Sequence, residues 1–558
     1  MRGFYKSAYI DKKGDKKFIA TTQFEPVDAR SCFPCFDEPE IKSIFSVSII
    51  INKDLDALSN MPIKSQVASK DEKKIIFEET PLMSTYLLAF IVGNFDYLEG
   101  KTRDNTKVRI ITTPGKKLHG KFALDIAIKS LDFYNDYFKI PYPLPKLDLI
   151  AIPDFESGAM ENWGLITYKE TALLIDEKNS SAAAKQRVAL VISHEIAHQW
   201  FGNLVTMKWW NDLWLNEGFA SWIEYKPIDQ MFPEWDLWTQ FLCMDTISAF
   251  SLDGLKTTHE IEVDVKNPNE IGEIFDAISY SKGASIIRML ENYLGEDKFR
   301  DGLRNYINNF KYSNARTDDL WLSFEMVSGE KIRQMMNTWT KQPGYPIIKV
   351  SSKNNEIIIE QEKFSYIKDN KKLLWNIPFS VSYKNKTFNK ILDKPSISLN
   401  YDIDYLNKSQ VGFYRVSYDE KFFNKIKIML KNLKTIDRLG MENNMFALAR
   451  GNKIKLNEYL NFLEYYKDED DYSVWSDISI NLFQISLMFP KNKEVEKFTR
   501  ELFFNIMNKI GWDEKKTEDH KTKMLRSVVL MTLGFNNEEK TLKEAEKRFD
   551  DYLIKKEL

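Results

Sequence analysis

The chain has 558 residues, of which 43% are hydrophobic and 13% aromatic, so it can form several globular cores and is not generally disordered. Lysine and arginine number 79 and aspartate and glutamate 81, and this balance gives no indication of a nucleic-acid or membrane partner. The apolar runs are far shorter than a membrane span, and three cysteines cannot form a disulfide framework, so we expect a cytoplasmic protein.

The chain divides into four segments that differ in the spacing of their apolar residues. Residues 1–98 alternate apolar and polar positions between turn signals, which predicts an N-terminal β-sheet domain. Residues 99–345 carry long amphipathic stretches that predict helices, and they end at the breaker cluster QPGYP. Residues 346–420 predict a small β-sandwich domain, and residues 421–558 predict an α-helical domain. The sequence therefore predicts a multidomain α+β fold.

The segment RVALVISHEIAHQWFGNLV is apolar at helical spacing and contains His194, Glu195 and His198 in the pattern HExxH. Residues four apart lie on one face of a helix, so both imidazoles can reach one metal ion at about 2.0–2.1 Å. Glu195 lies beside that face, where it can contact a water molecule but not the ion. Two histidines on zinc with a glutamate as general base are typical of zinc peptidases.

A catalytic zinc ion needs a third protein ligand, and Glu217 in LWLNEGFASW is the candidate. Eighteen residues separate it from His198, enough for a loop and the first turn of a second helix capped by Asn211 or Asp212. The alternative is that HExxH arose by chance and that its histidines are merely buried. Such a chance match is expected in about one chain in a hundred. The spacing favours one Zn²⁺ per chain and amide hydrolysis, and it leaves endopeptidase and exopeptidase open.

The segment PDFESGAMENWGLITY follows the apolar run LDLIAIP and contains the sequence GAMEN. Its small first residues permit close approach of another backbone. A substrate could add to this edge as a strand, with the glutamate of GAMEN facing its terminal ammonium. The alternative, from the residues alone, is a solvated glutamate in a loop. The five residues are Gly158, Ala159, Met160, Glu161 and Asn162.

Three features together resemble the gluzincin zinc aminopeptidases, the family of aminopeptidase N and puromycin-sensitive aminopeptidase: HExxH, the glutamate separated from it by eighteen residues, and GAMEN. The nearest branch is that of the puromycin-sensitive and tricorn-interacting aminopeptidases. The match extends over essentially the whole chain, because four further segments resemble landmarks of the family: TTQFEPVDARSCFPCFDEP (21–39), AISYSKGAS (277–285), MNTWTKQPGYP (336–346) and GMENNMFALARG (440–451). The resemblance implies a thermolysin-like α/β catalytic domain in residues 99–345.

The resemblance implies a role for each matching residue at the metal. Those that would bind zinc are His194, His198 and Glu217. Glu195 would act as the general base. Tyr280 of AISYSKG would donate its hydroxyl to the oxyanion of the tetrahedral intermediate. The alternative for Tyr280 is a core tyrosine, since the chain has 25 of them.

The resemblance also implies peptides with a free N-terminus as substrates. Glu25 of TTQFEP and Glu161 would hold the α-ammonium by charge-assisted hydrogen bonds, which would place the scissile bond one residue from the N-terminus. The remaining residues of GAMEN, from Gly158 to Asn162, would line the substrate beside them.

Both terminal domains are shorter than the family's, so we expect a fragment. Three other functions stay open: a thermolysin-type endopeptidase, an epoxide hydrolase, and an inactive peptide-binding fragment. Glu25 and Glu161 argue against the first, and Ala159 argues against the second, because epoxide hydrolases of this type carry glycine there. The intact Glu195 and metal ligands argue against the third. The sequence does not predict the preferred N-terminal residue or the oligomeric state.

Overall fold

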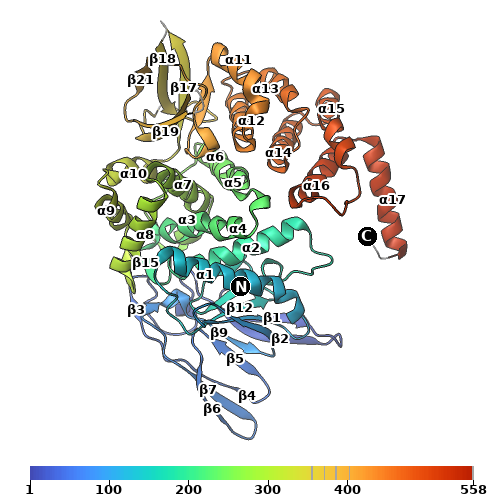
Figure 1. Ribbon diagram of the computed structural model, residues 1–558. Helices are drawn as coiled ribbons and strands as arrows, with labels where there is room; N and C mark the ends of the chain where they lie inside the picture. Colours follow the sequence, from blue (N-terminus) through green and yellow to red (C-terminus); the bar gives the residue numbers. More distant parts are fainter. Residues whose placement is uncertain (354–355, 370, 384–385, 401, 556–558) are drawn as a thin grey trace. The chain divides into compact units, whose positions relative to one another are not determined.

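The computed structural model describes residues 1–353, 356–369, 371–383, 386–400 and 402–555, and the chain forms two compact units. The first unit comprises Met1–Met231 and His259–Pro343, and the second comprises Phe232–Thr258 and Gly344–Leu558. Figure 1 labels their helices and strands. The expected fold class, a multidomain mixture of β sheets and helices, is confirmed. The division into four domains at the expected boundaries stays a prediction.

The N-terminal part of the first unit consists of strands, as its alternating pattern predicts. Strand β2 ends at Gln23, so Glu25 lies just beyond the end of this strand. The four-stranded antiparallel sheet has the order β1 (Gly3–Ile10), β2 (Lys16–Gln23), β9 (Phe90–Gly93) and β5 (Asp56–Ser59). The smaller sheets are β4 (Ser48–Asn52), β7 (Glu72–Phe77) and β6 (Ile63–Ala68), and the pair β3 (Lys42–Ser43) and β8 (Met83–Ser84).

A five-stranded sheet carries part of the GAMEN segment at one edge. Its order is β10 (Asp96–Lys101), β11 (Lys107–Thr112), β12 (Lys146–Ile152), β14 (Leu165–Lys169) and β13 (Ala159–Met160). Strands β11, β12 and β14 are parallel, and every residue of β12 is buried, as expected for a strand covered on both faces. The short strand β13, which contains part of GAMEN, lies at the edge and pairs antiparallel with β14.

Helices cover this sheet and continue the first unit. Helix α1 (Lys121–Phe138) packs on β10 and β11, and α2 (Ala182–Ala197) packs on α1 and beside β13 (Figure 1). The side chain of Ser181 caps α2 by accepting a hydrogen bond from the backbone N–H of Ala184. The remaining helices are α3 (Trp214–Ile223), α4 (Tyr225–Met231), α7 (Gly283–Leu294), α8 (Glu296–Phe310), α9 (Thr317–Ser328) and α10 (Ile332–Thr340).

The second unit combines a small β region with a helical array. Its four-stranded sheet has the order β21 (Ser396–Leu399), β18 (Glu356–Lys363), β17 (Pro346–Lys353) and β22 (Arg415–Tyr418), beside the hairpin β19 (Ile377–Tyr383) and β20 (Lys386–Leu392). Its helices are α5 (Leu237–Phe241), α6 (Ile247–Asp253), α11 (Glu420–Met429), α12 (Thr435–Arg450), α13 (Leu456–Leu463), α14 (Tyr472–Met488), α15 (Lys493–Ile510), α16 (His520–Phe535) and α17 (Glu539–Lys555). Within the described ranges, none of the helices combines the length and apolar character needed to cross a bilayer.

A buried lysine ties the central sheet to the segment that follows GAMEN. Lys146 is 4% exposed, and its ammonium donates to the Asp148 carboxylate and to the carbonyl oxygens of Ser59 and Gly164, each at 2.7 Å. Arg109 on β11 makes a bidentate pair with the same Asp148 carboxylate. All three ammonium protons are therefore used, and they join the N-terminal strands, β12 and the turn before β14.

We predict that Lys146→Met destabilises the protein by about 3–5 kcal/mol, because the substitution leaves two buried carbonyl groups without a donor and leaves Arg109 as the remaining cation paired with Asp148. Lys107→Met on the neighbouring strand is the control, since the ion pair of Lys107 with Glu99 is exposed and should contribute less than about 1 kcal/mol. Urea unfolding of both variants measures the difference. Equal stability of the two variants would contradict the linking role of Lys146.

Candidate metal centre

Helix α2 presents both histidines of HExxH from its last turn. His194 lies inside the helix, and His198 directly follows it with helical backbone angles and an N–H that donates to the His194 carbonyl oxygen at 3.2 Å. The two imidazole rings are 4.7 Å apart between centroids, and the side chains are 11% and 1% exposed. The helical spacing therefore brings both rings to one buried point, as predicted.

Helix α3 brings Glu217 to the same point from its first turn. The predicted cap of this helix by Asn211 or Asp212 is wrong, because the helix begins at Trp214 after Leu213, with no side-chain cap. The Asp212 carboxylate instead accepts from the backbone N–H and the hydroxyl of Thr317, at 3.2 and 2.7 Å. Thr317 is the first residue of α9, so Asp212 stabilises the N-terminus of a helix distant in the sequence.

The segment between α2 and α3, for which the sequence predicts a loop, contains a short strand. Strand β15 (Val205–Met207) pairs in parallel with β16 (Ser313–Ala315). The pairing fixes the route of the chain between His198 and α3, so the position of Glu217 depends on a strand more than a hundred residues away.

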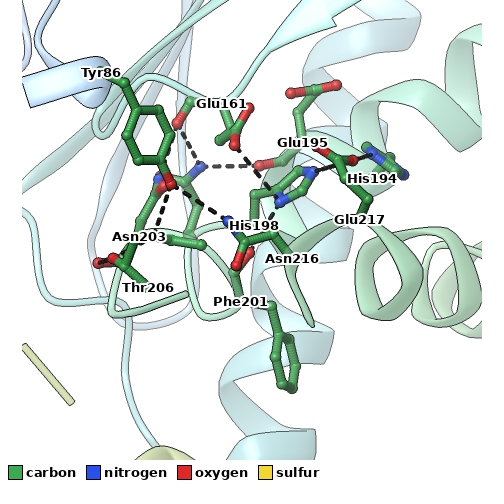
Figure 2. A network of polar contacts seen from close by, with 12 residues as sticks. Tyr86, Glu161, His194, Glu195, His198, Phe201, Asn203, Thr206, Asn216 and Glu217 are labelled. Carbon is green, nitrogen blue, oxygen red and sulfur yellow. Dashed lines mark hydrogen bonds and ion pairs between the residues drawn. The ribbon is translucent and has the colours of Figure 1, made fainter. Parts of the chain in front are cut away.

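The three side chains have the spacing of a tetrahedral metal site. Nε2 of His194 and Nε2 of His198 are 3.1 Å apart, and each lies 3.3 Å from Oε2 of Glu217. Ligand atoms about 2.0–2.1 Å from one ion in tetrahedral geometry are about 3.3 Å from each other. Two neutral imidazoles and one carboxylate also form a common donor set of a catalytic zinc site. Figure 2 shows the three side chains converging.

Each imidazole is oriented by a hydrogen bond on its far side. Nδ1 of His194 lies 2.7 Å from Oε2 of Glu224, and Nδ1 of His198 lies 2.9 Å from the Phe201 carbonyl oxygen. Both partners are acceptors, so each Nδ1 carries the proton and each Nε2 can present its lone pair to a metal. The tautomer needed for metal binding is thus determined by the protein.

Two further carboxylates lie beside the triad. One oxygen from each of Glu25, Glu161 and Glu217 falls within a cluster of atoms all less than 4.8 Å apart. Oε1 of Glu25 and Oε1 of Glu161 are buried and have no hydrogen-bond partner among the described residues. Three carboxylates thus converge, and two of them each have a buried oxygen without a hydrogen-bond partner among the described residues, an arrangement that suits a cationic ligand.

The GAMEN segment presents Glu161 from the edge of the sheet. Ala159 and Met160 form β13, and a Cβ added to Gly158 would meet nothing within 4 Å, so this edge is open. The Glu161 backbone carbonyl accepts a hydrogen bond from Nδ2 of Asn203 at 2.9 Å. Asn162 is 1% exposed and donates to the Thr167 hydroxyl, so its side chain holds the turn within the sheet.

Burial and the mutual repulsion of the carboxylates set the ionisation of the site. Burial raises the pKa of Glu25 well above its usual range, and Glu161, Glu217 and Glu195 raise it further. Burial likewise raises the pKa of Glu195 to about 8, against the opposing effect of the histidines. Burial alone would raise the pKa of Glu217 as well, but the positively charged form of the two histidines lowers it to about 2.

Tyr280 lies against the first histidine. It belongs to a π-helical turn (Ile278–Lys282) that leads into α7, and its ring is stacked on that of His194, with centroids 6.2 Å apart and planes 9° apart. Burial, together with Glu217, raises its pKa well above the usual value, so the phenol keeps its proton. The hydroxyl can therefore act as a hydrogen-bond donor.

Four functional residues were not identified from the sequence. Glu224 orients His194, and Asn203 and Gln199 bind the Glu161 carbonyl. The Tyr86 hydroxyl donates to the Gly202 carbonyl at 3.2 Å. Figure 2 labels Tyr86, Asn203 and Glu161. Glu224 follows Glu217 by seven residues, two helical turns, and this spacing is a signal that could have found it. Gln199 and Asn203 are polar residues inside an apolar run, but nothing near Tyr86 indicates its partner.

Comparison with known protein families shows three matching domains. The sequence matches the Peptidase M1 N-terminal domain over residues 1–87, the Peptidase family M1 domain over residues 122–339, and the ERAP1-like C-terminal domain over residues 405–558. The matched ranges include the candidate metal-binding triad, GAMEN and the TTQFEP segment. The resemblance inferred from the motifs is thereby confirmed.

Several curated proteins are similar over nearly the whole chain. Aminopeptidase M1-A of Oryza sativa subsp. japonica is 46% identical over 577 residues, covering 100% of this chain and 66% of its own length. Tricorn protease-interacting factor F2 of Thermoplasma volcanium is 41% identical, covering 94% and 66%, and puromycin-sensitive aminopeptidase of Caenorhabditis elegans is 40% identical, covering 100% and 61%. The chain thus spans a little less than two thirds of the length of these relatives.

We predict that Glu224→Ala lowers zinc affinity by about 10- to 100-fold, because His194 loses the acceptor that fixes its tautomer and orientation. Glu224→Gln is the matched control, since its amide oxygen can still accept from Nδ1 and should preserve most of the affinity. Competition titration with a chromogenic chelator measures both. Unchanged affinity of the alanine variant would exclude this orienting role.

Proposed function

Because the chain belongs to peptidase family M1, we propose that it is a zinc-dependent aminopeptidase that hydrolyses the first peptide bond of peptides with a free N-terminus. The observation that carries the proposal is the pair of buried carboxylates, Glu25 and Glu161, beside the triad of His194, His198 and Glu217. An internal peptide bond has no ammonium group, so an endopeptidase would gain nothing from this anionic cluster.

We assign one zinc ion per chain to Nε2 of His194, Nε2 of His198 and a carboxylate oxygen of Glu217. The separations of about 3.3 Å and the fixed Nδ1 protons support this assignment. The chemistry that zinc supplies at such a site is Lewis-acid polarisation of the substrate carbonyl and activation of a water molecule.

Glu195 is the proposed general base. One of its carboxylate oxygens, Oε2, is buried without a hydrogen-bond partner among the described residues, so it is available to a water molecule. It takes a proton from the attacking water and returns it to the leaving amine, so no proton is gained or lost overall.

Glu25 and Glu161 are the proposed anchors for the α-ammonium of the substrate. Their unpartnered Oε1 atoms can accept its protons, and the ionic hydrogen bonds hold the N-terminus at a fixed distance from the metal ligands. The substrate backbone extends the sheet at the free edge of β13, beside Gly158 and Ala159. The position of the anchors then determines that cleavage occurs at the first peptide bond.

Tyr280 is the proposed donor to the oxyanion. The negative charge that develops on the carbonyl oxygen during attack is stabilised by a hydroxyl that is already in place. The stacking on His194 supports this role, because it holds the ring beside a metal ligand.

We also propose a cytoplasmic location. All three cysteines, Cys32, Cys35 and Cys243, are free thiols, which supports a reducing compartment. Fractionation of the source cells tests it directly.

We predict that the protein cleaves leucyl 4-nitroanilide and not N-acetyl-leucyl 4-nitroanilide, because acetylation removes the charge that Glu25 and Glu161 bind. A chelator should abolish the cleavage, and added zinc should restore it. Glu195→Gln is the control variant, which should bind zinc normally and lose about 10²- to 10⁴-fold in kcat. Equal cleavage of both substrates would instead favour an endopeptidase.

We predict that Glu161→Gln lowers kcat/KM for the free-amine substrate by about 10- to 100-fold, since a charged hydrogen bond of about 1.5–3 kcal/mol is lost. Zinc content should not change. Glu156→Gln is the matched control, because this glutamate lies five residues before Glu161, on the other side of β13, and its side chain is 72% exposed. The kcat/KM of this control variant should stay within about twofold of the wild type. An equal loss in both variants would exclude a specific anchor.

A further inference from the structure

The turn that carries Tyr280 is held by a residue to which no role has yet been assigned. We propose that Asp276, supported by His259, is a positioning residue that fixes this turn and so directs the Tyr280 hydroxyl into the site. The inference deepens the proposed function and depends on it for the role of Tyr280. It stands on the hydrogen bonds that join His259, Asp276 and the backbone of the turn.

Asp276 binds the first backbone amides of the turn. Its Oδ1 accepts from the N–H of Ile278 at 2.8 Å and of Ser279 at 3.2 Å, and its own carbonyl oxygen accepts from the N–H of Tyr280 at 3.1 Å. The first N–H groups of a helical turn have no partner within the turn, so a side-chain acceptor is needed to stabilise it. Three consecutive amides, ending with that of Tyr280, therefore depend on one residue.

His259 holds the second oxygen of this carboxylate. Its Nε2 lies 3.0 Å from Oδ2 of Asp276, and its Nδ1 lies 2.7 Å from the Glu260 carbonyl oxygen. Both partners are acceptors, and only the imidazolium can donate to both at once. The hydrogen bond to Asp276 raises the pKa of His259, against burial and the charge of Lys282. The carboxylate is thus fixed at both oxygens, which determines the direction of Oδ1.

The opposite side of the turn is fixed by a contact between two glycines. A Cβ on Gly218, the residue after Glu217, would lie 3.2 Å from the backbone of Gly283 and 3.3 Å from the Ser279 carbonyl oxygen. The turn therefore packs directly against the backbone of α3 and cannot move closer to it. Asp276 restrains the first amides of the turn and the glycine contact restrains the turn against α3, so both act on the backbone that carries the Tyr280 ring against His194.

The kinetic test separates positioning from a general structural role. Asp276→Ala should lower kcat by about tenfold or more with KM within about twofold, because Tyr280 acts on charge present only in the transition state. In the Tyr280→Phe background the same substitution should cost less than about twofold, since the group it positions is gone. An equal loss in both backgrounds would overturn the proposal.

Three further variants sharpen this test. Asp276→Asn keeps an acceptor for both amides and should retain more kcat than Asp276→Ala. His259→Ala should show a smaller loss of the same kind, because the carboxylate remains but is less fixed. Glu273→Ala removes an exposed carboxylate three residues before Asp276 and should leave kcat unchanged. Equal kcat for Asp276→Asn and Asp276→Ala would exclude the amide acceptor as the cause.

Hydrogen exchange provides a readout that does not require activity. The amides of Ile278 and Ser279 should exchange on the order of tenfold faster in Asp276→Ala than in the wild type, while amides in α1 exchange at the wild-type rate. Unchanged exchange of the two amides would overturn the proposal. If the wild type cleaves no free-amine substrate, the proposed function fails, and the exchange rates still decide whether Asp276 fixes the turn.

Discussion

The balance of buried charge at the metal centre is the constraint on which the rest of the site depends. Four carboxylates, those of Glu25, Glu161, Glu195 and Glu217, lie close enough to shift one another's ionisation. Burying an unpaired charge costs several kcal/mol, so such a cluster is stable only with positive charge near it. A divalent metal and a substrate ammonium both provide that charge. The electrostatics that favours the metal therefore also favours a substrate with a free amine.

The geometry of the site is determined by groups that form hydrogen bonds to the site residues or to the backbone that carries them. Backbone carbonyl groups and buried polar side chains hold the imidazoles, the GAMEN edge and the Tyr280 turn. These groups, those of Phe201, Asn203 and Asp276, lie in the connections between helices and strands, and their hydrogen bonds restrain these connections. Such restraint suits a site in which a misplacement of about 1 Å matters. Lys146 extends this support to the N-terminal strands, because it contacts Ser59 and Gly164 together.

The sequence was sufficient for the features that depend on local spacing. The pair His194 and His198 follows from helical periodicity, and Glu217 follows from its distance along the chain. The start of α3 was not predictable, because the Asp212 carboxylate binds Thr317, which is 105 residues away. The convergence of Glu25 on the triad came from family resemblance alone, since β2 and α2 are far apart in sequence. Long-range contacts of this kind produce no periodic pattern in the amino-acid sequence.

The edge strand β13 has a consequence for how a long peptide would be shortened. A peptide that pairs with this edge and loses one residue must advance by one residue to present its new N-terminus. Adjacent side chains of a strand point to opposite faces, so an advance by one position exchanges the faces of all of them, and sliding in register is not possible. The product must detach and rebind, and an edge of only two residues opposes detachment little. For the aminopeptidase activity and substrate pairing proposed above, this edge therefore favours distributive shortening, in which each intermediate is released into solution, over processive degradation.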